Sequence, residues 1–319
     1  MSDVVIGFDV GGTRLKSGAV DRRGRLLAEG ITPSDATAGP ERLLKRLVAE
    51  TARLSKRVRP RAIALGFPGA VDPEKGVVLL PGRLDGLENF PLVPKLAAKT
   101  GLPVFADNDA RLAMLAEARY GLAKGETWAL TVTLGTGVGT CPLLDGKILR
   151  DPHFQFGTQM SHMVMQSRDG RLCFTGARGT AEMLCSATAL ASQVRDGLAR
   201  GIPSILADRW QADPHAIDCE AVMEAVARKD RLACDELRVW TEHLGWFLVS
   251  AIHAYAPRIV ILAGGATHGA RHFLKPLRAQ VAAHVFRWPR HSAPALVISK
   301  MRDHAGVLGA AALAWENLG

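Results

Sequence analysis

The feature of this sequence that most constrains its fold is one pattern that occurs twice. In residues 4–31, two apolar stretches are separated by a Gly-Gly-Thr turn, and an Asp-Arg-Arg-Gly turn leads into a third stretch. Residues 129–149 repeat this order with a Gly-Thr-Gly turn and an Asp-Gly turn. Apolar runs between such turn signals predict β-strands. We therefore expect a duplicated unit and two similar halves around a cleft, although two unrelated hairpins would give the same pattern.

The rest of the chain predicts alternating helices and strands. Strands are expected at residues 62–67, 104–106, 258–262 and 295–298, and helices at about 40–55, 93–100, 108–120, within 180–256 and from 306 onward. This order indicates an α/β fold, and 319 residues are enough for two domains. We expect a small α/β domain of residues 1–118 with a C-terminal helix at about 303–319, and a large α/β domain of residues 119–302.

The net charge of +9 admits nucleic-acid binding as one interpretation. However, the Lys and Arg residues are scattered singly or in pairs, and no Cys/His spacing typical of a zinc finger is present. The distribution favours a basic, solvated surface that attracts anionic nucleotides. We therefore expect no nucleic-acid partner.

Composition also disfavours membrane insertion and a disulfide framework. The sequence contains no run of about 18 apolar residues, so no membrane span is expected. The first residues lack the basic and apolar regions of a secretory signal. The five cysteines contain no C-x-x-C spacing, which favours reduced thiols. We expect a cytoplasmic protein without a membrane partner.

The first segment with chemical potential is the turn after the first strand. Its glycines, Gly11 and Gly12, followed by Thr13, allow backbone N–H groups to approach an anion closely. Asp9 is a candidate ligand of Mg²⁺ through water, and Lys16 a candidate for neutralising phosphate charge. A tight hairpin with a surface lysine is the alternative. No Gly-Lys-Ser/Thr closes the segment, so it is not a Walker A motif.

Two further glycine segments fit the same chemistry. Gly135, Thr136 and Gly137 form a second turn between strands, at the matching place in the duplicated unit. Two such turns would grip a triphosphate from both sides. Gly264 and Gly265 follow a predicted buried strand, where they would let a flat ring pack on the backbone. A simple strand-to-helix turn explains this pair equally well.

A third candidate is the Asp-Asn-Asp run at residues 107–109, between a short strand and a helix. Asp109 is a candidate general base for an attacking hydroxyl, since kinases typically use one such Asp. An unperturbed Asp has a pKa of about 3.9 and would be ionised at neutral pH without special tuning. The alternative is that these residues only cap the helix.

Taken in order, these segments resemble the ROK family of sugar kinases and repressors over essentially the whole chain. The matching motifs are D-x-G-G-T-x-x-K at residues 9–16, G-x-P-G-x-V-D at 66–72, N-D-A at 108–110, L-G-T-G-x-G at 134–139, Gly264-Gly265 and A-G-V-x-G-A-A at 305–311. The resemblance implies a two-domain actin-like/ribonuclease H-like ATPase fold, with a duplicated β-meander-plus-helices unit around a central cleft.

The resemblance also implies an ATP- and Mg²⁺-dependent kinase of a hexose or a hexose-like sugar, assembled as a homo-oligomer, with a dimer expected. Asp109 would be the general base, Asn108 would hold a sugar hydroxyl, and Gly69 would lie at the sugar. Repressors of the family carry an N-terminal helix-turn-helix. In this sequence the strand that precedes the first glycine turn begins at Val4, which leaves no room for a helix-turn-helix before it and disfavours DNA binding.

The sequence departs from the family pattern at a zinc motif of one His and three Cys. His162 and Cys173 are present, but Thr175 and Thr180 occupy two cysteine positions. Thr hydroxyls are poor zinc ligands and a structural site needs four good ones. We therefore expect no zinc. His162 remains a candidate for sugar binding or a purely structural histidine.

Further departures concern the sugar. The family pattern has two sugar-binding Glu residues, of which Glu182 is kept and the other is Gln159. An amide both donates and accepts, whereas a carboxylate accepts strong charge-assisted bonds. The family Asn that follows a Pro is Gly82 here. We expect a kinase with an altered sugar site, the alternative being a catalytically silent sugar or nucleotide sensor of the same fold.

Overall fold

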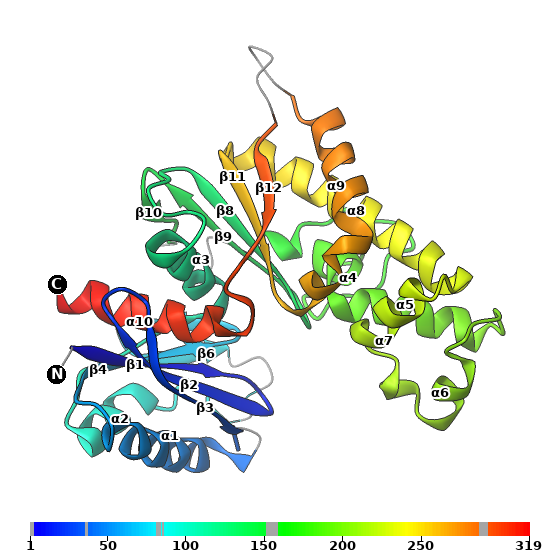
Figure 1. Ribbon diagram of the computed structural model, residues 1–319. Helices are drawn as coiled ribbons and strands as arrows, with labels where there is room; N and C mark the ends of the chain where they lie inside the picture. Colours follow the sequence, from blue (N-terminus) through cyan, green and yellow to red (C-terminus); the bar gives the residue numbers. More distant parts are fainter. Residues whose placement is uncertain (1–2, 36–37, 81–83, 85, 151–158, 287–292) are drawn as a thin grey trace. The chain divides into compact units, whose positions relative to one another are not determined.

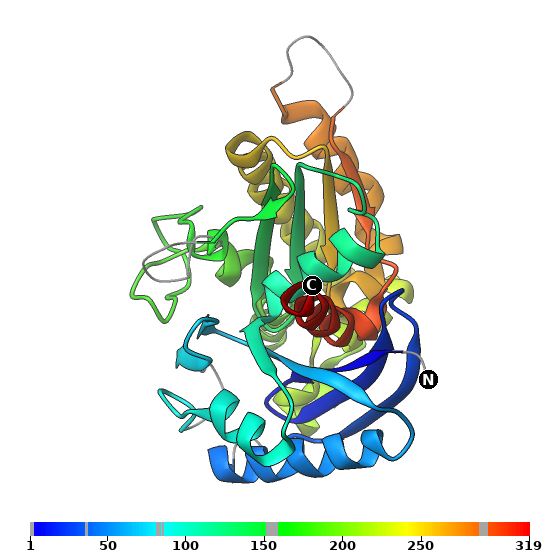
Figure 2. The same cartoon turned by 90° about the vertical axis from the view of Figure 1, so that its left-hand side faces the viewer.

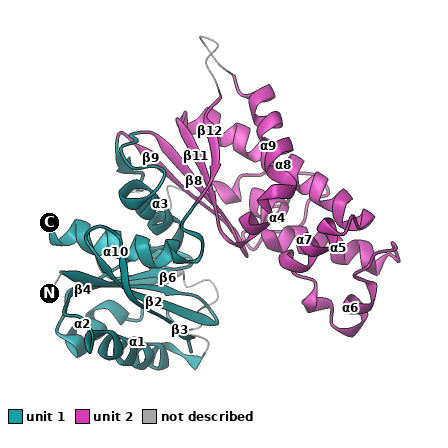
Figure 3. Cartoon of the chain, in the orientation of Figure 1, with its two compact units in different colours: residues 1–127, 146–158, 300–319 teal, residues 128–145, 159–299 magenta. Residues whose placement is uncertain are grey.

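The computed structural model describes residues 3–35, 38–80, 84, 86–150, 159–286 and 293–319. The chain forms two compact units, coloured separately in Figure 3. Unit 1 contains residues 1–127, 146–158 and 300–319, and unit 2 contains residues 128–145 and 159–299. Unit 1 is therefore built from segments that lie far apart in the sequence. The expected domain limits at residues 118 and 302 stay a prediction.

Unit 1 is organised around a five-stranded sheet in the order β3-β2-β1-β4-β7 (Figure 1). β1, β2 and β3 form an antiparallel meander, whereas β4 and β7 run parallel to β1. The carboxyl ends of β1, β4 and β7 therefore meet at one edge, where open α/β sheets commonly bind ligands. The strands are β1 (Val4–Val10), β2 (Arg14–Asp21), β3 (Leu26–Pro33), β4 (Pro60–Phe67) and β7 (Val104–Asn108).

Helices cover both faces of this sheet because its strands are apolar on both sides. Ile6 and Phe8 of β1 belong to the core cluster that contains residues of α1 and α2, whereas Val5 belongs to the cluster with α3 and α10. Figure 2 views α10 nearly end-on, with α1 on the opposite face of the sheet. The helices are α1 (Pro40–Ser55), α2 (Leu92–Thr100), α3 (Asp109–Tyr120) and α10 (Ala305–Leu318).

Small residues allow α10 to pack unusually close to its neighbours. A Cβ atom on Gly7 of β1 would lie 2.3 Å from the carbonyl oxygen of Val307. A Cβ atom on Gly309 would lie 2.1 Å from the carbonyl oxygen of Leu112 in α3. Both distances are well below van der Waals contact, so side chains at these two glycines would force the backbones apart. The A-G-V-x-G-A-A stretch is therefore a packing motif in this protein.

Unit 2 has a sheet that contains the strand order β9-β8-β11-β12. β9 is antiparallel to β8, whereas β11 and β12 run parallel to β8. The core contains the fully buried rings of Trp240, Phe247 and Phe273. The elements are β8 (Ala129–Leu134), β9 (Val138–Leu144), β11 (Ile259–Ala263), β12 (Ala295–Ile298), α4 (Ala181–Cys185), α5 (Ala187–Ala199), α6 (Ala207–Ala212), α7 (Cys219–Ala227), α8 (Arg231–Tyr255) and α9 (Ala270–His284).

The strands expected from the repeated pattern are present in both places. The third strand of the second copy is short, β10 (Lys147–Ile148), and belongs to unit 1. The pattern did not predict the two-stranded ribbon of β5 (Ala70–Asp72) and β6 (Val77–Leu80), because these strands are short and follow a Pro-Gly sequence. Within the described ranges, no helix combines the length and apolar character needed to cross a membrane.

Candidate active site

The first cluster of candidate residues lies at the carboxyl edge of the unit 1 sheet. β1 and β2 pair so that Asp9 is directly opposite Lys16, which places both side chains on the same face of the sheet. Burial raises the pKa of Asp9, and the charge of Lys16 offsets only part of this effect. A Cβ atom on Gly306, at the start of α10, would lie 2.5 Å from Cγ of Asp9. Gly306 therefore leaves the space that the Asp9 carboxyl occupies.

The turn between β1 and β2 is held by its own backbone and by one serine. The N–H of Gly11 donates to the carbonyl oxygen of Arg14 at 3.0 Å. The hydroxyl of Ser34 donates to the carbonyl oxygen of Gly12 at 2.8 Å, and its N–H donates to that of Thr13 at 3.1 Å. The glycine turn is thus a fixed structure, with its carbonyl groups directed at Ser34.

Lys16 has a partner that the sequence did not reveal. Its ammonium group lies 3.2 Å from the carbonyl oxygen of Asp303 and 3.4 Å from the carboxylate of the same residue. Asp303 lies in a short 3₁₀ turn, Arg302–His304, directly before α10. A negative charge therefore already faces the lysine that we expect to contact phosphate.

The second part of this cluster is the start of α3. Asn108 is the N-cap: its side-chain oxygen accepts from the N–H groups of Ala110 and Arg111 at 3.0 and 3.3 Å. Its amide group donates to the carbonyl oxygen of Gly69 at 2.7 Å and to Asp109 at 3.0 Å. Asn108 therefore caps α3, and its contact with a sugar stays a prediction. Its hydrogen-bonding groups are in use, and they connect Gly69 with Asp109.

Asp109 is the first residue of α3, and its carboxylate accepts from the N–H of Ala110 at 2.8 Å. Desolvation and then the nearby charge of Asp9 raise the pKa of Asp109 to about 7. Its side chain is nevertheless exposed, so water screens part of this effect. The expectation of an untuned Asp was wrong, because the sequence shows neither the desolvation of this carboxyl nor the nearby charge of Asp9.

Asp107 has a structural part in the same loop. It is fully buried and forms ion pairs with Arg111 at 2.5 Å and with Arg150 at 2.7 Å. Its carboxylate also accepts from the N–H of Asn108 at 2.7 Å. Removing one partner of a buried ion pair is strongly destabilising, because the other charge is left in a poorly solvated place. This network fixes the backbone that carries Asn108 and Asp109.

The second cluster lies in unit 2, where the ends of β8 and β11 meet. Gly264 has a φ of 89° and a ψ of 169°, a conformation almost restricted to glycine. A Cβ atom there would lie 2.5 Å from the carbonyl oxygen of Leu134. The close approach brings Gly264 and Gly265 next to the turn formed by Gly135, Thr136 and Gly137.

Glu182, in the first turn of α4, reaches this turn. Its carboxylate accepts from the N–H of Val138 at 3.2 Å, and a Cβ atom on Gly137 would lie 2.4 Å from the same oxygen. The predicted sugar-side carboxylate therefore contacts the backbone of the predicted phosphate turn. Nothing in the local sequence indicated this contact, since the two sites are 44 residues apart.

His162 and Cys173 also come together in unit 2. Nδ1 of His162 lies 3.8 Å from Sγ of Cys173, and its ring packs edge-on against the exposed Phe174. Burial raises the pKa of the Cys173 thiol, but hydrogen bonds involving Thr175 and Thr180 outweigh burial, so the net pKa is lowered. Two of the four positions of the family zinc motif, His162 and Cys173, thus lie close together, and Thr175 and Thr180 influence the Cys173 thiol.

Comparison with known proteins decides the family. A sequence profile of the ROK family matches residues 5–317. The chain belongs to the ROK family. A glucokinase of Thermotoga maritima is 30% identical over 318 residues, covering 99% of this chain and 98% of the relative.

Solved structures agree with this assignment. A ROK family glucokinase from Streptomyces griseus, in complex with glucose and AMPPNP, superposes with a TM-score of 0.84 at 28% identity, covering 98% of this chain and 99% of that one. A ROK hexokinase from Thermus thermophilus gives a TM-score of 0.79 at 29% identity, covering 99% of each chain. The α/β, actin-like ATPase fold implied by the motifs is confirmed.

The zinc implied by the ROK family motif does not fit the groups present in this chain. Structural zinc sites use four thiolate, imidazole or carboxylate ligands. His162 and Cys173 supply two, and neutral Thr hydroxyls stand at the other two positions. Among the residues that the structure describes, no group of three or more His, Cys, Asp or Glu residues is arranged to hold a metal ion. Gln159, the other departure from the ROK pattern, is exposed, and Gly82 lies outside the described residues.

Proposed function

We propose that this chain transfers the γ-phosphoryl group of ATP to a hydroxyl of a hexose or a hexose-like sugar. Its relatives include glucokinases and a hexokinase, and one was solved with glucose and AMPPNP. The observation that carries the proposal is Asp109, an exposed carboxyl with a raised pKa, fixed by two hydrogen bonds at the start of α3.

Asp109 acts as the general base. The sugar hydroxyl oxygen forms a bond to the γ-phosphorus while the bond to the ADP oxygen breaks, and the hydroxyl proton passes to the Asp109 carboxylate. A base with a pKa near the working pH combines adequate ionisation with good proton affinity. Asn108 and Gly69 position this carboxylate, and a direct contact of Asn108 with the sugar is a further part of the proposal.

The glycine turns and Lys16 bind the phosphates. Positioning and charge stabilisation account for most of the catalysis of phosphoryl transfer. Lys16 exchanges its contact with Asp303 for a phosphate oxygen, while the Gly135–Gly137 turn and Gly264-Gly265 hold the rest of the nucleotide. Mg²⁺, when bound, neutralises phosphate charge, and the Asp9 carboxylate would hold it through water, which suits a hard cation.

The sugar-side residues are Gln159, His162 and Glu182, together with the Asn108 loop. The Gln at residue 159 alters the hydrogen-bonding pattern relative to a Glu, so we expect a sugar other than the commonest family substrate to be favoured. A homodimer in the cytoplasm completes the proposal. Sedimentation analysis tests the dimer directly.

The experiment that tests the proposal is ADP release from Mg-ATP across a panel of sugars. The panel contains glucose, mannose, fructose, allose, N-acetylhexosamines and cyclic polyols, with the Asp109→Asn variant as the blank. Turnover with one sugar supports the kinase and identifies what Gln159 accepts. Absence of turnover with every sugar, in folded protein that still binds ATP, contradicts it.

The second candidate function is a catalytically silent sugar or nucleotide sensor. The loss of two zinc-motif cysteines favours it, whereas the presence of Asp109, Asp9 and both glycine turns disfavours it. A sensor would bind sugar or ATP, measured by calorimetry, without releasing ADP. The same panel therefore separates the two candidates.

A further inference from the structure

The segment from His162 to Thr180 leads directly into Glu182 and folds without the zinc of its family. Its centre is the thiol of Cys173, which is 2% exposed and faces Nδ1 of His162 at 3.8 Å. Thr175 lies in the tight turn that the N–H of Gly176 closes by donating to the carbonyl oxygen of Cys173 at 3.0 Å, and Thr180 pairs with Val164. Thr180 is fully buried, and its hydroxyl has no conventional hydrogen-bond partner among the described residues. The Cys173 cluster consists of this thiol–imidazole contact together with Thr175 and Thr180, which occupy the other two positions of the family zinc motif.

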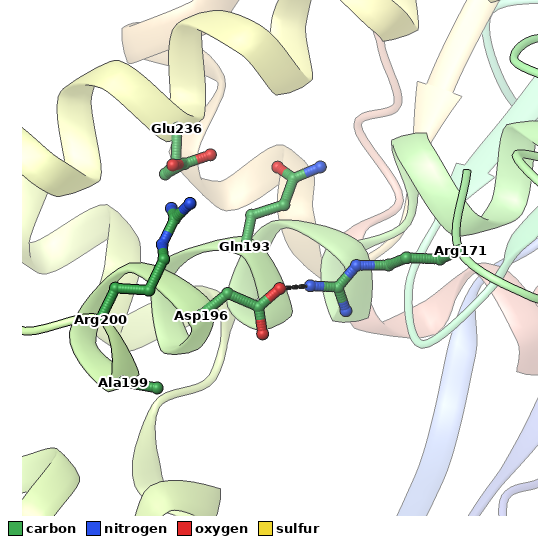
Figure 4. Close-up of a pocket in the computed structure, with 6 residues that line it drawn as sticks. All are labelled: Arg171, Gln193, Asp196, Ala199, Arg200 and Glu236. Atoms are coloured by element: carbon green, nitrogen blue, oxygen red, sulfur yellow. Dashed lines mark hydrogen bonds and ion pairs between the residues drawn. The ribbon is translucent and has the colours of Figure 1, made fainter. Parts of the chain in front are cut away.

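A second attachment lies outside this cluster. Arg171, within the segment, forms an ion pair with Asp196 on α5, marked by the dashed line in Figure 4. Both residues line a depression together with Arg200 and Glu236, whose side chains approach one another in the same view. Burial raises the pKa of Glu236, and the charge of Arg200 offsets only part of this rise. Charges of alternating sign thus run from the segment onto α5 and α8.

Backbone bonds transmit these attachments to Glu182. The carbonyl oxygen of Gly179 accepts from the N–H groups of Met165 and Gln166 at 2.9 and 3.1 Å. The N–H of Gly179 donates to the carbonyl oxygen of Arg171 at 2.9 Å. The N–H of Ala181 then donates to Met163 at 2.9 Å, one residue before Glu182. Backbone hydrogen bonds therefore connect Arg171 through Gly179 to the residues that begin α4.

We propose that the Arg171–Asp196 ion pair and the Cys173 cluster take the structural place of a metal ion in this segment. Together they hold the segment against α5 and thereby position Glu182 at the Val138 N–H. Arg171, Asp196, Thr175 and Thr180 are positioning residues. Their effect on sugar binding rests on the proposed function, whereas their effect on the segment itself does not.

The first test removes the ion pair with Asp196→Asn. An exposed pair changes an equilibrium by about two- to fivefold, so amide hydrogen exchange in residues 163–180 should accelerate by about that factor. With the active sugar from the panel, KM for sugar should rise about threefold while kcat and KM for ATP change little. The double variant Arg171→Asp/Asp196→Arg should restore both values. Unchanged exchange in Asp196→Asn would overturn the proposal, whether or not the protein is a kinase.

A matched control lies in the same unit. Arg231 and Asp235 form another exposed ion pair, at 3.8 Å on α8. Asp235→Asn removes a charge of the same kind without touching the segment. It should leave both the amide hydrogen exchange of residues 163–180 and the KM for sugar unchanged. If Asp235→Asn changed them as much as Asp196→Asn does, the effect of Asp196 would come from the loss of any negative charge and not from its ion pair.

The second test restores a metal. A tetrahedral zinc site with ligand distances of about 2.0–2.3 Å places neighbouring ligand atoms about 3.3–3.8 Å apart, and the 3.8 Å between His162 and Cys173 lies at the upper end of this range. The variant Thr175→Cys/Thr180→Cys should therefore bind about one zinc per chain. Added to Asp196→Asn, this change should make hydrogen exchange of the segment slow again only when zinc is present. A stoichiometric zinc in the wild-type protein, or no zinc in the double-cysteine variant, would overturn the proposal.

Discussion

The two glycine turns share a strand geometry but differ in chemistry. In unit 1, the strand pair one step before the turn is Asp9 opposite Lys16. In unit 2, the corresponding pair is Thr133 opposite Gly139, neither of which is charged. The second turn is contacted instead by Glu182, which comes from α4 and accepts the Val138 N–H.

This difference shows what is reused and what is not when a structural unit occurs twice. In both units we expect the hairpin turn to present backbone N–H groups to phosphate, a function that needs only small residues and tight turns. Charge chemistry depends on side chains, and it is concentrated at the unit 1 edge, where Asp9, Lys16, Asp109 and Asp303 lie. We therefore expect unit 1 substitutions to affect rate and pH dependence, and unit 2 turn substitutions to affect shape and stability.

The largest expected effect is at Asp109. Asp109→Asn keeps the size of the side chain but removes the proton acceptor, so kcat should fall by about 10²–10⁴-fold while ATP binding stays nearly unchanged. Steady-state kinetics and calorimetric titration with ATP measure the two quantities. Turnover within a few-fold of wild type would show that Asp109 is not the base, and would contradict the assignment of the charge chemistry to the unit 1 edge.

The next effect is on stability, and it tests the unit 2 turn. Gly264→Ala places a Cβ at a φ of 89° and 2.5 Å from a backbone carbonyl, so strain alone should cost about 1–3 kcal/mol. The midpoint of urea unfolding should therefore decrease. Gly265→Ala is the matched control, because its Cβ would meet no atom within 4 Å. Equal midpoints for the two variants would show that the stability of this turn does not depend on a glycine at residue 264.

The pH dependence should come from unit 1. Because the pKa of Asp109 is raised toward about 7, kcat/KM should fall with decreasing pH below neutrality, approaching tenfold per unit. The same raised pKa means that the group's contribution to folding stability is present at low pH and is lost as pH rises through the folded value. A rate profile that stays flat down to pH ~5 would assign Asp109 an ordinary pKa.

The smallest effect is expected at Asp303. Asp303→Asn removes the carboxylate that faces Lys16, a partly exposed contact that competes with phosphate. KM for Mg-ATP should fall about two- to fivefold, with kcat little changed. Asp3→Asn, which breaks the exposed pair with Arg61 in the same unit, serves as the control. An increase in KM would instead indicate that Asp303 helps to hold the metal.

The sequence predicts those parts of the fold and site that depend on neighbours along the chain. The meander of residues 4–31, the glycine turns and the cap at Asn108 all follow from local turn and capping chemistry. Contacts between distant residues do not. Lys16 and Asp303 are 287 residues apart, and no local signal pairs them. The pKa of Asp109 depends on Asp9, which the register of β1, β4 and β7 brings near.

The close packing of α10 affects the order in which the two units can fold during synthesis. Segments that emerge first from the ribosome usually fold first, but unit 1 needs residues 300–319 to complete it. Until α10 is synthesised, Val5 of β1 lacks the part of its cover that α10 provides, Asp9 lacks the neighbouring Gly306, and Lys16 lacks Asp303. Unit 2, which ends at residue 299, is available earlier. A nascent chain therefore cannot assemble the edge that carries Asp9 and Lys16 until α10 has left the ribosome.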